Sequence, residues 1–273
     1  MSYFQEGSIA FCDVRVPSML HLRRETIKEL IVSDGSVNVK NLTDRFNVSI
    51  ETVRRDLEYL EKKGYLKRVY GGAVAVSLSP DEPSYHFRKE HNYSEKLTIG
   101  AKAAELVNDG DTLLMSHGTS TIQVARHLRG KKNLTVVTNS LNIAAEFNDC
   151  PAVSVFCLGG SLRHGEFYTA GVLAEQNIAR FNADKLILGI GGITLEHGIT
   201  DYHVDESELL RLYVQSSACV IGVADHSKFG LVCTFNLCPA QRLTHLVTDS
   251  AVGESTLAPF REHGIQVHVA GAK

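Results

Sequence analysis

Residues 48–73, with the sequence VSIETVRRDLEYLEKKGYLKRVYGGA, decide how the first part of the chain folds. Ser49 is of a type that caps helices, because its hydroxyl accepts a hydrogen bond from a free amide of the first turn. Apolar residues then recur with helical spacing, which predicts a helix over 50–62. The apolar side of this helix consists of Val53, Leu57 and Leu60. The run 64–73 that follows has the pattern of a strand, a glycine-rich turn and a second strand.

Two further short helices are predicted upstream. Apolar spacing predicts a helix over 23–33, ended by the turn at 34–35, and another over 39–46. Two short helices, a tight turn and a capped third helix form a helix-turn-helix, and the strand–turn–strand after it is a wing. In such a module the third helix lies in the DNA major groove, where arginine forks match guanine edges or phosphates. The alternative is a small helical bundle for dimerisation, with its arginines merely solvated.

The candidate DNA contacts come from the third helix and the wing. The helix presents polar residues away from its apolar side, and wing cations can reach phosphates. The residues expected to contact DNA are Ser49, Glu51, Thr52, Arg54, Arg55, Lys67, Arg68 and Tyr70.

The charge is uneven along the chain. The formal net charge of −3 alone argues against a nucleic-acid-binding protein. Residues 20–75, however, hold 11 basic and 8 acidic side chains, whereas the remainder holds 17 and 23. A basic segment joined to an acidic one predicts two separate tasks.

Length and composition exclude several classes of protein. The chain has 273 residues, 44% of them hydrophobic and 22% charged, which is typical of one large or two modest globular domains. No transmembrane run and no secretory signal is recognisable, so a cytoplasmic location without a membrane partner is expected. Six scattered cysteines favour free thiols over a disulfide or metal framework. No metal or cofactor is expected; the nearest suggestion of a metal site is DYHVD at 201–205.

The second part of the chain alternates strand and helix patterns. A proline- and serine-rich connector at 77–84 precedes it. The candidate strands are Thr112–Met115, Leu134–Val137, Val153–Leu158, Lys185–Leu188, Cys219–Ala224 and Leu246–Thr248. The candidate helices are Lys96–Leu106, Thr121–Leu128, Leu141–Phe147, Leu173–Phe181, Glu206–Gln215 and Ser255–Glu262. This order predicts a parallel sheet covered by helices, which binds ligands at the carboxyl ends of its strands.

Polar turns follow four of these candidate strands, at 116–121, 138–140, 159–163 and 225–230. Their glycines let the backbone approach a ligand, and hydroxyls and free helix amides can hold an oxyanion. If the turns converge, they form a pocket for a phosphate or carboxylate. The sequence contains no Walker A phosphate loop, no G-x-S-x-G nucleophile elbow and no G-x-G-x-x-G motif after a candidate strand.

At these residues a family resemblance becomes visible. Residues 23–75 resemble the winged helix-turn-helix of the DeoR family of bacterial transcription regulators, through V-S-x-x-T-V-R-R-D-L at 48–57 and L-E-x-x-G-Y-L-x-R-x-Y-G-G-A at 60–73. Tyr70 stands where family members often have histidine. Residues 93–248 resemble the DeoR-type sensor domain, whose fold is similar to ribose-5-phosphate isomerase and the CoA transferases. The matching segments are 116–121, T-N-S at 138–140, G-G at 159–160, L-G-x-G-G-I at 188–193, H-G-I-T at 197–200 and D-H-S-K-F-G at 225–230.

The resemblance implies a pocket for a phosphorylated sugar or a related metabolite. The turn at 118–121 would hold the phosphate, Lys228 would add positive charge and Asn139 would bind a hydroxyl or phosphate oxygen. Glu206 matches an acidic position near the start of the family's next helix. The residues expected to bind the effector are Ser116, Gly118, Thr119, Ser120, Thr121, Asn139, Ser140, Gly160, Arg163, Glu206 and Lys228.

Two departures bear on the activity. Related isomerases carry acids in the segment that here reads G-I-G-G-I-T at 189–194, and Leu210 stands where relatives often have lysine. Proton transfer between carbons needs a placed base, so the pocket is expected to be a sensor and the chain not an enzyme. The alternative is a sugar-phosphate isomerase or transferase that carries a DNA-binding module.

The expected organisation has four parts. Residues 1–19 are an unassigned extension, 20–75 the winged helix-turn-helix, 76–92 a linker and 93–273 the α/β effector-sensing domain. The expected function is repression of a carbohydrate operon. The expected partners are double-stranded operator DNA, a sugar phosphate or phosphorylated sugar acid or alcohol, and further copies of the chain in a dimer or tetramer.

Overall fold

The computed structural model describes residues 19–34, 36–63, 65–75 and 82–271. The chain divides into two compact units, residues 1–77 and 78–273, each described by itself. Residues 1–18 and 76–81, which include most of the predicted extension and part of the predicted linker, lie outside the described residues. None of the helices in the described ranges combines the length and apolar character needed to cross a bilayer.

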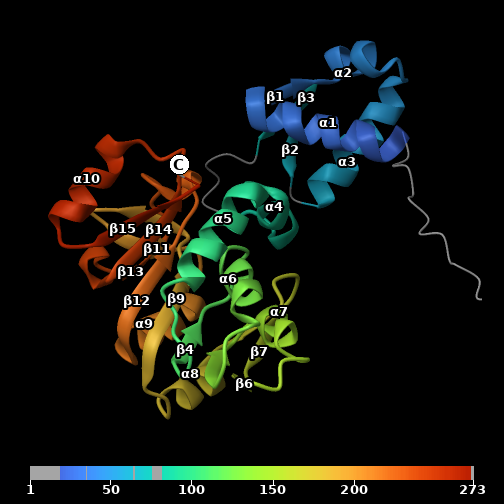
Figure 1. Cartoon of the computed structure of the whole chain (residues 1–273). Coiled ribbons are helices and arrows are strands. Elements are labelled where there is room, and N and C mark those ends of the chain that lie inside the picture. Colours follow the sequence, from blue (N-terminus) through green and yellow to red (C-terminus); the bar gives the residue numbers. More distant parts are fainter. Residues whose placement is uncertain (1–18, 35, 64, 76–81, 272–273) are drawn as a thin grey trace, which may run out of the picture. The chain divides into compact units, whose positions relative to one another are not determined.

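The first unit is the predicted winged helix-turn-helix (Figure 1). Its elements are α1 (Met19–Asp34), β1 (Ser36–Asn38), α2 (Val39–Phe46), α3 (Ile50–Lys62), β2 (Leu66–Val69) and β3 (Gly72–Ala75). The bounds predicted for the second and third helices are confirmed, whereas α1 begins four residues earlier than predicted and β1 was not expected. The three strands form an antiparallel sheet in the order β1-β3-β2.

The core of this unit is built by the helical apolar spacing seen in the sequence. Its fully buried side chains are Ile27, Ile31, Leu42, Val53, Leu57, Leu60 and Leu66. The wing turn requires both of its glycines. Gly71 has a φ of +82°, in the left-handed region, and a Cβ at Gly72 would lie 2.0 Å from the carbonyl oxygen of Val37 on β1. The glycine pair therefore lets β3 pass close to β1.

The second unit contains a seven-stranded parallel sheet in the order β15-β14-β12-β9-β4-β5-β6 (Figure 1). Its strands are β4 (Thr112–Met115), β5 (Leu134–Thr138), β6 (Val153–Cys157), β9 (Ala183–Gly189), β12 (Ser217–Val223), β14 (His245–Asp249) and β15 (Gln266–Ala270). Six of them correspond to the candidate strands, and β15 was missed. The predicted α/β fold with a parallel sheet is confirmed.

Helices cover both faces of this sheet. They are α5 (Tyr93–Ala104), α6 (Thr121–Leu128), α7 (Leu141–Glu146), α8 (Val172–Ile178), α9 (Val204–Gln215) and α10 (Glu254–Glu262), and the short helix α4 (Tyr85–Glu90) precedes α5. Alternate strand residues point to opposite faces: Leu113 and Met115 pack with the helices α5, α6 and α7, whereas Leu114 packs with α8, α9 and α10. The sheet is buried on both sides, as a parallel sheet must be.

The second unit also contains smaller elements outside the seven-stranded sheet, and none of them was expected from the sequence. A second sheet has the order β10-β11-β13 and an antiparallel hairpin joins β7 to β8. Their bounds are β7 (Ser161–Arg163), β8 (Tyr168–Ala170), β10 (Gly192–Thr194), β11 (Gly198–Asp201) and β13 (Phe235–Cys238), and the short 3-10 helices are η1 (His226–Lys228) and η2 (Ala240–Arg242). Helix α4 lies in the segment assigned to the linker and packs within the second unit.

Candidate functional site

The N-terminal half of α3 presents an exposed polar surface. The hydroxyl of Ser49 accepts a hydrogen bond from the amide of Thr52 at 3.2 Å and lies 3.0 Å from the Thr52 hydroxyl, so the predicted cap is confirmed. Glu51, Arg54 and Arg55 are exposed, and Thr52 is half-buried. Because the buried face of α3 is fixed in the core, both guanidinium groups project from a rigid helix.

The wing contributes a second group of exposed polar side chains. Lys67, Arg68 and Tyr70 are all exposed, and Tyr70 is fully so. Arg68 is held by Glu61 at the end of α3, with Nε 2.6 Å from a carboxylate oxygen and the backbone amide 2.8 Å from the other. Hydrogen bonds from the backbone and side chain of Arg68 lower the pKa of Glu61. This pair ties the wing to the end of α3 and engages Arg68, which stays exposed beside Lys67 and Tyr70.

A buried carboxylate that the sequence reasoning missed joins α1 to α3. Asp56 is 1% exposed and accepts hydrogen bonds from Nε of Arg23 at 2.6 Å and Nε of Arg24 at 2.7 Å. The guanidinium of Arg24 also lies 3.7 Å from the ring centre of Tyr59. Asp56 follows Arg54 and Arg55 directly, so the same helix turn anchors α3 and presents its cations.

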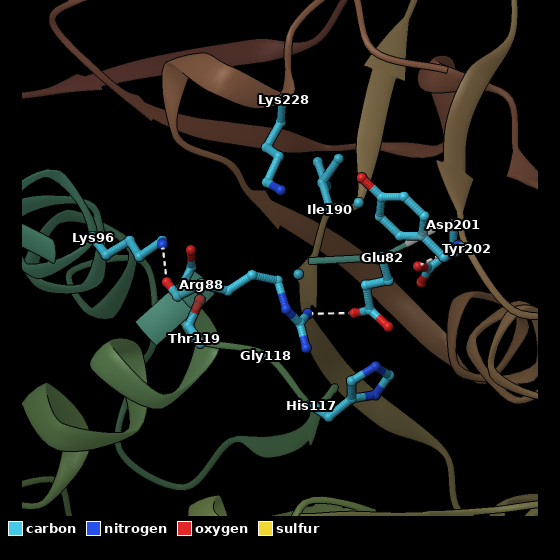
Figure 2. Close-up of a pocket in the computed structure, with 13 residues that line it drawn as sticks. Glu82, Arg88, Lys96, His117, Gly118, Thr119, Ile190, Asp201, Tyr202 and Lys228 are labelled. Atoms are coloured by element: carbon cyan, nitrogen blue, oxygen red, sulfur yellow. Dashed lines mark hydrogen bonds and ion pairs between the residues drawn. The ribbon is translucent and has the colours of Figure 1, made fainter. Parts of the chain in front are cut away.

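In the second unit, a cavity of about 60 Å³ lies where several strand ends meet (Figure 2). The turn after β4, the end of β9, the end of β11 and η1 all contribute to it, together with α4, α5 and the segment before α4. Its lining consists of Glu82, Arg88, Lys96, His117, Gly118, Thr119, Ser120, Gly189, Ile190, Gly191, Asp201, Tyr202 and Lys228. Two of the four predicted polar turns, 116–121 and 225–230, therefore line the cavity, whereas the turns at 138–140 and 159–163 do not.

The turn after β4 has the form of an anion site. Among the described residues, no acceptor is found for the backbone amides of Gly118, Thr119 and Ser120, which lie directly before α6. Lys228 points into the same pocket (Figure 2), and no ion pair or hydrogen bond of its ammonium is found in the described ranges. Free amides at a helix start with a nearby ammonium can bind a phosphate or carboxylate.

Other predicted effector residues serve the fold beside the pocket. The hydroxyl of Ser116 accepts from the amide of Gly189 at 2.9 Å and ties β4 to β9, and the hydroxyl of Thr121 donates to the carbonyl of Gly118 at 3.0 Å. The Asn139 amide donates to the Thr169 carbonyl at 2.9 Å, and the Ser140 hydroxyl caps α7. A Cβ at Gly160 would lie 2.6 Å from the Ala170 carbonyl oxygen, so that glycine lets two segments pass closely.

Arg163 and Glu206 form a network directly behind the pocket lining. The Arg163 guanidinium is ion-paired with Glu206 and donates to the hydroxyl of Tyr168 at 2.6 Å. Nε2 of His117, a lining residue, lies 3.3 Å from the Glu206 carboxylate. Arg163 also lies 3.1 Å from the carboxylate of Glu82. The two predicted residues therefore act on the pocket through the side chains they contact.

The electrostatics of the pocket come from groups that the sequence reasoning did not single out. Lys96 is 3% exposed and donates to the carbonyls of Arg88 and His91 at 2.5 Å each. Burial lowers the pKa of Lys96 to about 8. Burial raises the pKa of Asp201, and burial lowers that of His117. In the sequence, only the position of Arg88 and Lys96 in the polar segment after the connector could have indicated that they belong to the pocket.

One group of side chains in the described residues has the spacing of metal ligands. Glu82, His203 and Glu206 each bring an atom within 4.8 Å of the others. His203 belongs to the 201–205 segment noted in the sequence. The guanidinium of Arg163 contacts all three residues, so a cation of the protein already serves this group.

Comparisons with known proteins agree with this architecture. The model of the DeoR-like helix-turn-helix domain matches residues 23–78, and that of the DeoR C terminal sensor domain matches residues 91–250. The chain is 31% identical to the HTH-type transcriptional regulator GolR of Listeria innocua, over 91% of this chain and 98% of that protein. It is 32% identical to the glycerol-3-phosphate regulon repressor of Escherichia coli K12, over 90% and 98% of the two chains.

Among solved structures, the ribose 5-phosphate isomerase A of Methanocaldococcus jannaschii superimposes on 50% of this chain and 55% of its own with a TM-score of 0.38 and 12% identity. The family assignment rests on the sequence matches, which cover both units. With a winged helix-turn-helix in its first unit and the sensor-domain match in its second, the chain belongs to the DeoR family of transcriptional regulators.

Proposed function

We propose that this chain is a repressor of a carbohydrate-metabolism operon, released from operator DNA by a phosphorylated sugar or a related anionic metabolite. The observation that carries the effector part is the turn at 118–120, whose amides have no acceptor among the described residues and which shares a pocket with Lys228. The names of similar proteins also support it, since one is called a glycerol-3-phosphate regulon repressor and another a putative aga operon transcriptional repressor.

On this proposal, the exposed face of α3 enters the major groove. Arg54, Arg55, Glu51, Thr52 and the Ser49 turn meet base edges or phosphates, and Lys67, Arg68 and Tyr70 of the wing meet the backbone. The chain acts in the cytoplasm as a dimer or tetramer, because a symmetric assembly matches half-sites about 34 Å apart or multiples of that distance.

DNA binding is tested with the purified full chain and a labelled duplex from upstream of its own gene. Fluorescence anisotropy should show binding whose affinity falls with salt, with a log–log slope of about −0.9 per phosphate contacted. A random duplex of equal length is the control. Salt-insensitive binding, or no binding to any duplex from the surrounding intergenic DNA, would exclude the proposed function.

Lys228→Ala tests the effector pocket. The variant should bind operator as wild type does, yet bind inorganic phosphate roughly tenfold or more weakly, because hydrogen bonds to charged groups contribute about 1.5–3 kcal/mol. Isothermal titration measures the phosphate affinity. Lys132→Ala, which removes an exposed lysine outside the pocket, is the matched control and should change neither property. Loss of operator binding with unchanged phosphate affinity would contradict the pocket assignment.

A second function, isomerisation of a sugar phosphate, is favoured by one observation. The segment 189–194 has no carboxylate, but the end of β11 brings Asp201 into the same pocket. Burial raises the pKa of Asp201, the direction that suits a group exchanging protons near neutral pH. Incubation with pentose and hexose phosphates, followed by product analysis, separates the two functions; turnover that Asp201→Asn abolishes would favour the enzyme.

A further inference from the structure

The pocket already contains an anion supplied by the chain itself. The side chain of Glu82 is 5% exposed, and one carboxylate oxygen lies 2.5 Å from Nη1 of Arg88. The other oxygen lies 3.1 Å from Nη2 of Arg163 and 3.3 Å from Nε2 of His203. Figure 2 shows the Glu82 carboxylate facing the Arg88 guanidinium inside the cavity. Side chains from α4, β7 and the start of α9 thus converge on one carboxylate.

Glu82 holds this position as a charged group. Burial alone would raise its pKa, but the neighbouring His203 and the charges of Arg88 and Arg163 outweigh burial and lower the pKa to about 2. A buried carboxylate is tolerated only with such partners. Arg88 is also paired with Glu166, and Arg163 with Glu206. Glu82 is therefore the one carboxylate of this set that lines the cavity itself.

The place of Glu82 in the chain sets it apart from these other carboxylates. Glu166 and Glu206 belong to the hairpin region and to α9, within the second unit. Glu82 is also part of the second unit, but it precedes α4, and only residues 76–81 separate it in the sequence from the end of β3 in the wing. The chain thus inserts a carboxylate into its effector pocket at the segment that connects the two units.

We propose that Glu82 is an internal ligand of the pocket, which the anionic group of an effector displaces from Arg88 and Arg163. This inference rests on the proposed function. The phosphate or carboxylate of an effector offers a guanidinium group the same pattern of acceptor oxygens as Glu82 does, so it can replace Glu82 there. Withdrawal of Glu82 would free space in the cavity beside the guanidinium of Arg88, which lines it.

Competition of this kind links effector binding to the connecting segment. Glu82 and the effector's anion exclude each other, so whatever stabilises the Glu82 contacts weakens effector binding by the same factor. An effector that displaces Glu82 releases the chain at residue 82. The Glu82 contacts thus set the effector concentration at which this release occurs.

Glu82→Gln in the full chain tests the inference, with inorganic phosphate as the probe and isothermal titration as the measurement. The amide keeps the size of the side chain but loses the charge that competes, so phosphate should bind about tenfold more tightly than to wild type. Glu105→Gln removes an exposed charge at the residue directly after α5, outside the pocket, and should leave phosphate affinity unchanged. Unchanged or weaker binding by Glu82→Gln would overturn the inference; weaker binding would mean that Glu82 contributes to the ligand site.

A double-mutant cycle locates the effect. Adding Arg88→Ala to Glu82→Gln should remove the gain in affinity, because Arg88 lines the cavity and is the guanidinium from which the Glu82 charge is withdrawn. A gain that survives Arg88→Ala would overturn the role of Arg88. If Glu82→Gln does not fold, Glu82→Asp, which keeps the charge but shortens its reach, should bind phosphate more tightly than wild type, and unchanged or weaker binding would overturn the inference.

Failure of the proposed function gives a different result. In that case phosphate affinity is indifferent to Lys228→Ala, or the wild-type chain binds no DNA, whatever Glu82→Gln does. Failure of the Glu82 inference alone leaves the Lys228 dependence and the DNA binding intact and abolishes only the gain in Glu82→Gln.

Discussion

Replacing Arg54 and Arg55 together by alanine is expected to weaken operator binding by a factor of about 30 to 10⁴. Both side chains are exposed on the N-terminal half of α3, which the Ser49 cap and the buried face of the helix hold rigid. An arginine that reads a base contributes about 1–3 kcal/mol, so two of them lose roughly twice that if their contributions add. Lys62, the third basic residue of α3, lies in the last turn of the helix and is ion-paired with Glu58.

Fluorescence anisotropy at fixed salt, with operator and non-operator duplexes, measures this loss. Each single variant separates two roles: a lost base contact reduces the preference for operator, whereas a lost phosphate contact weakens binding to all duplexes alike and lowers the salt slope by about one. The control Lys132→Ala/Arg180→Ala removes two exposed cations of the second unit and should bind as wild type does. Binding by the double variant within twofold of wild type would contradict the assignment of α3 as the reading helix.

The helix-turn-helix was predictable because its signals are local. The cap at Ser49 and the buried positions Val53, Leu57 and Leu60 are all set within a few residues of one another, and the bounds of α3 followed from them. α1 was predicted too short because its first turn carries exposed Leu20 and Leu22, which contribute no buried stripe. In the second unit, alternating strands and helices predicted the parallel sheet for the same local reasons.

The pocket was predicted only in part, because its composition is decided by distant partners. The turn at 118–120 and Lys228 were found from polar residues at strand ends, where parallel strands converge. Asn139 and Ser140 have the same appearance in the sequence, but they bond to Thr169 and to the start of α7. Nothing local distinguishes a polar residue that serves the fold from one that faces a ligand.

Glu82 and Arg88 are the opposite case, because they line the pocket although the sequence did not indicate it. Glu82 lies in the segment 77–84, whose proline and serine content predicts a solvated connector, and Arg88 follows it. Yet Glu82 is buried by Arg163 and His203, which are more than 80 residues away in the sequence. Their role depends on how α4 packs in the second unit, and such packing leaves no periodic pattern in so short a helix.

Asp56→Ala is expected to destabilise the first unit by about 3 kcal/mol. Removing one partner of a buried ion pair costs about 3–5 kcal/mol, because the remaining charges lose their compensation. The lower end applies here, since Arg23 and Arg24 are 14% and 20% exposed and can regain water. Both guanidinium groups come from α1, so the substitution also loosens the packing of α1 on α3. Asp56→Asn, which keeps an acceptor oxygen, should lose less than Asp56→Ala.

Hydrogen exchange of backbone amides in α1 and α3, followed by mass spectrometry of the full chain, measures this stability without interference from the second unit. Protection in both helices should fall together in Asp56→Ala, while strands β4 and β9 keep theirs. Asp44→Asn, an exposed carboxylate on α2, is the matched control and should exchange as wild type does. Because Arg54 and Arg55 lie on the same turn of α3 as this anchor, operator binding should weaken as well. Unchanged protection in α1 would show that Asp56 does not hold the two helices together.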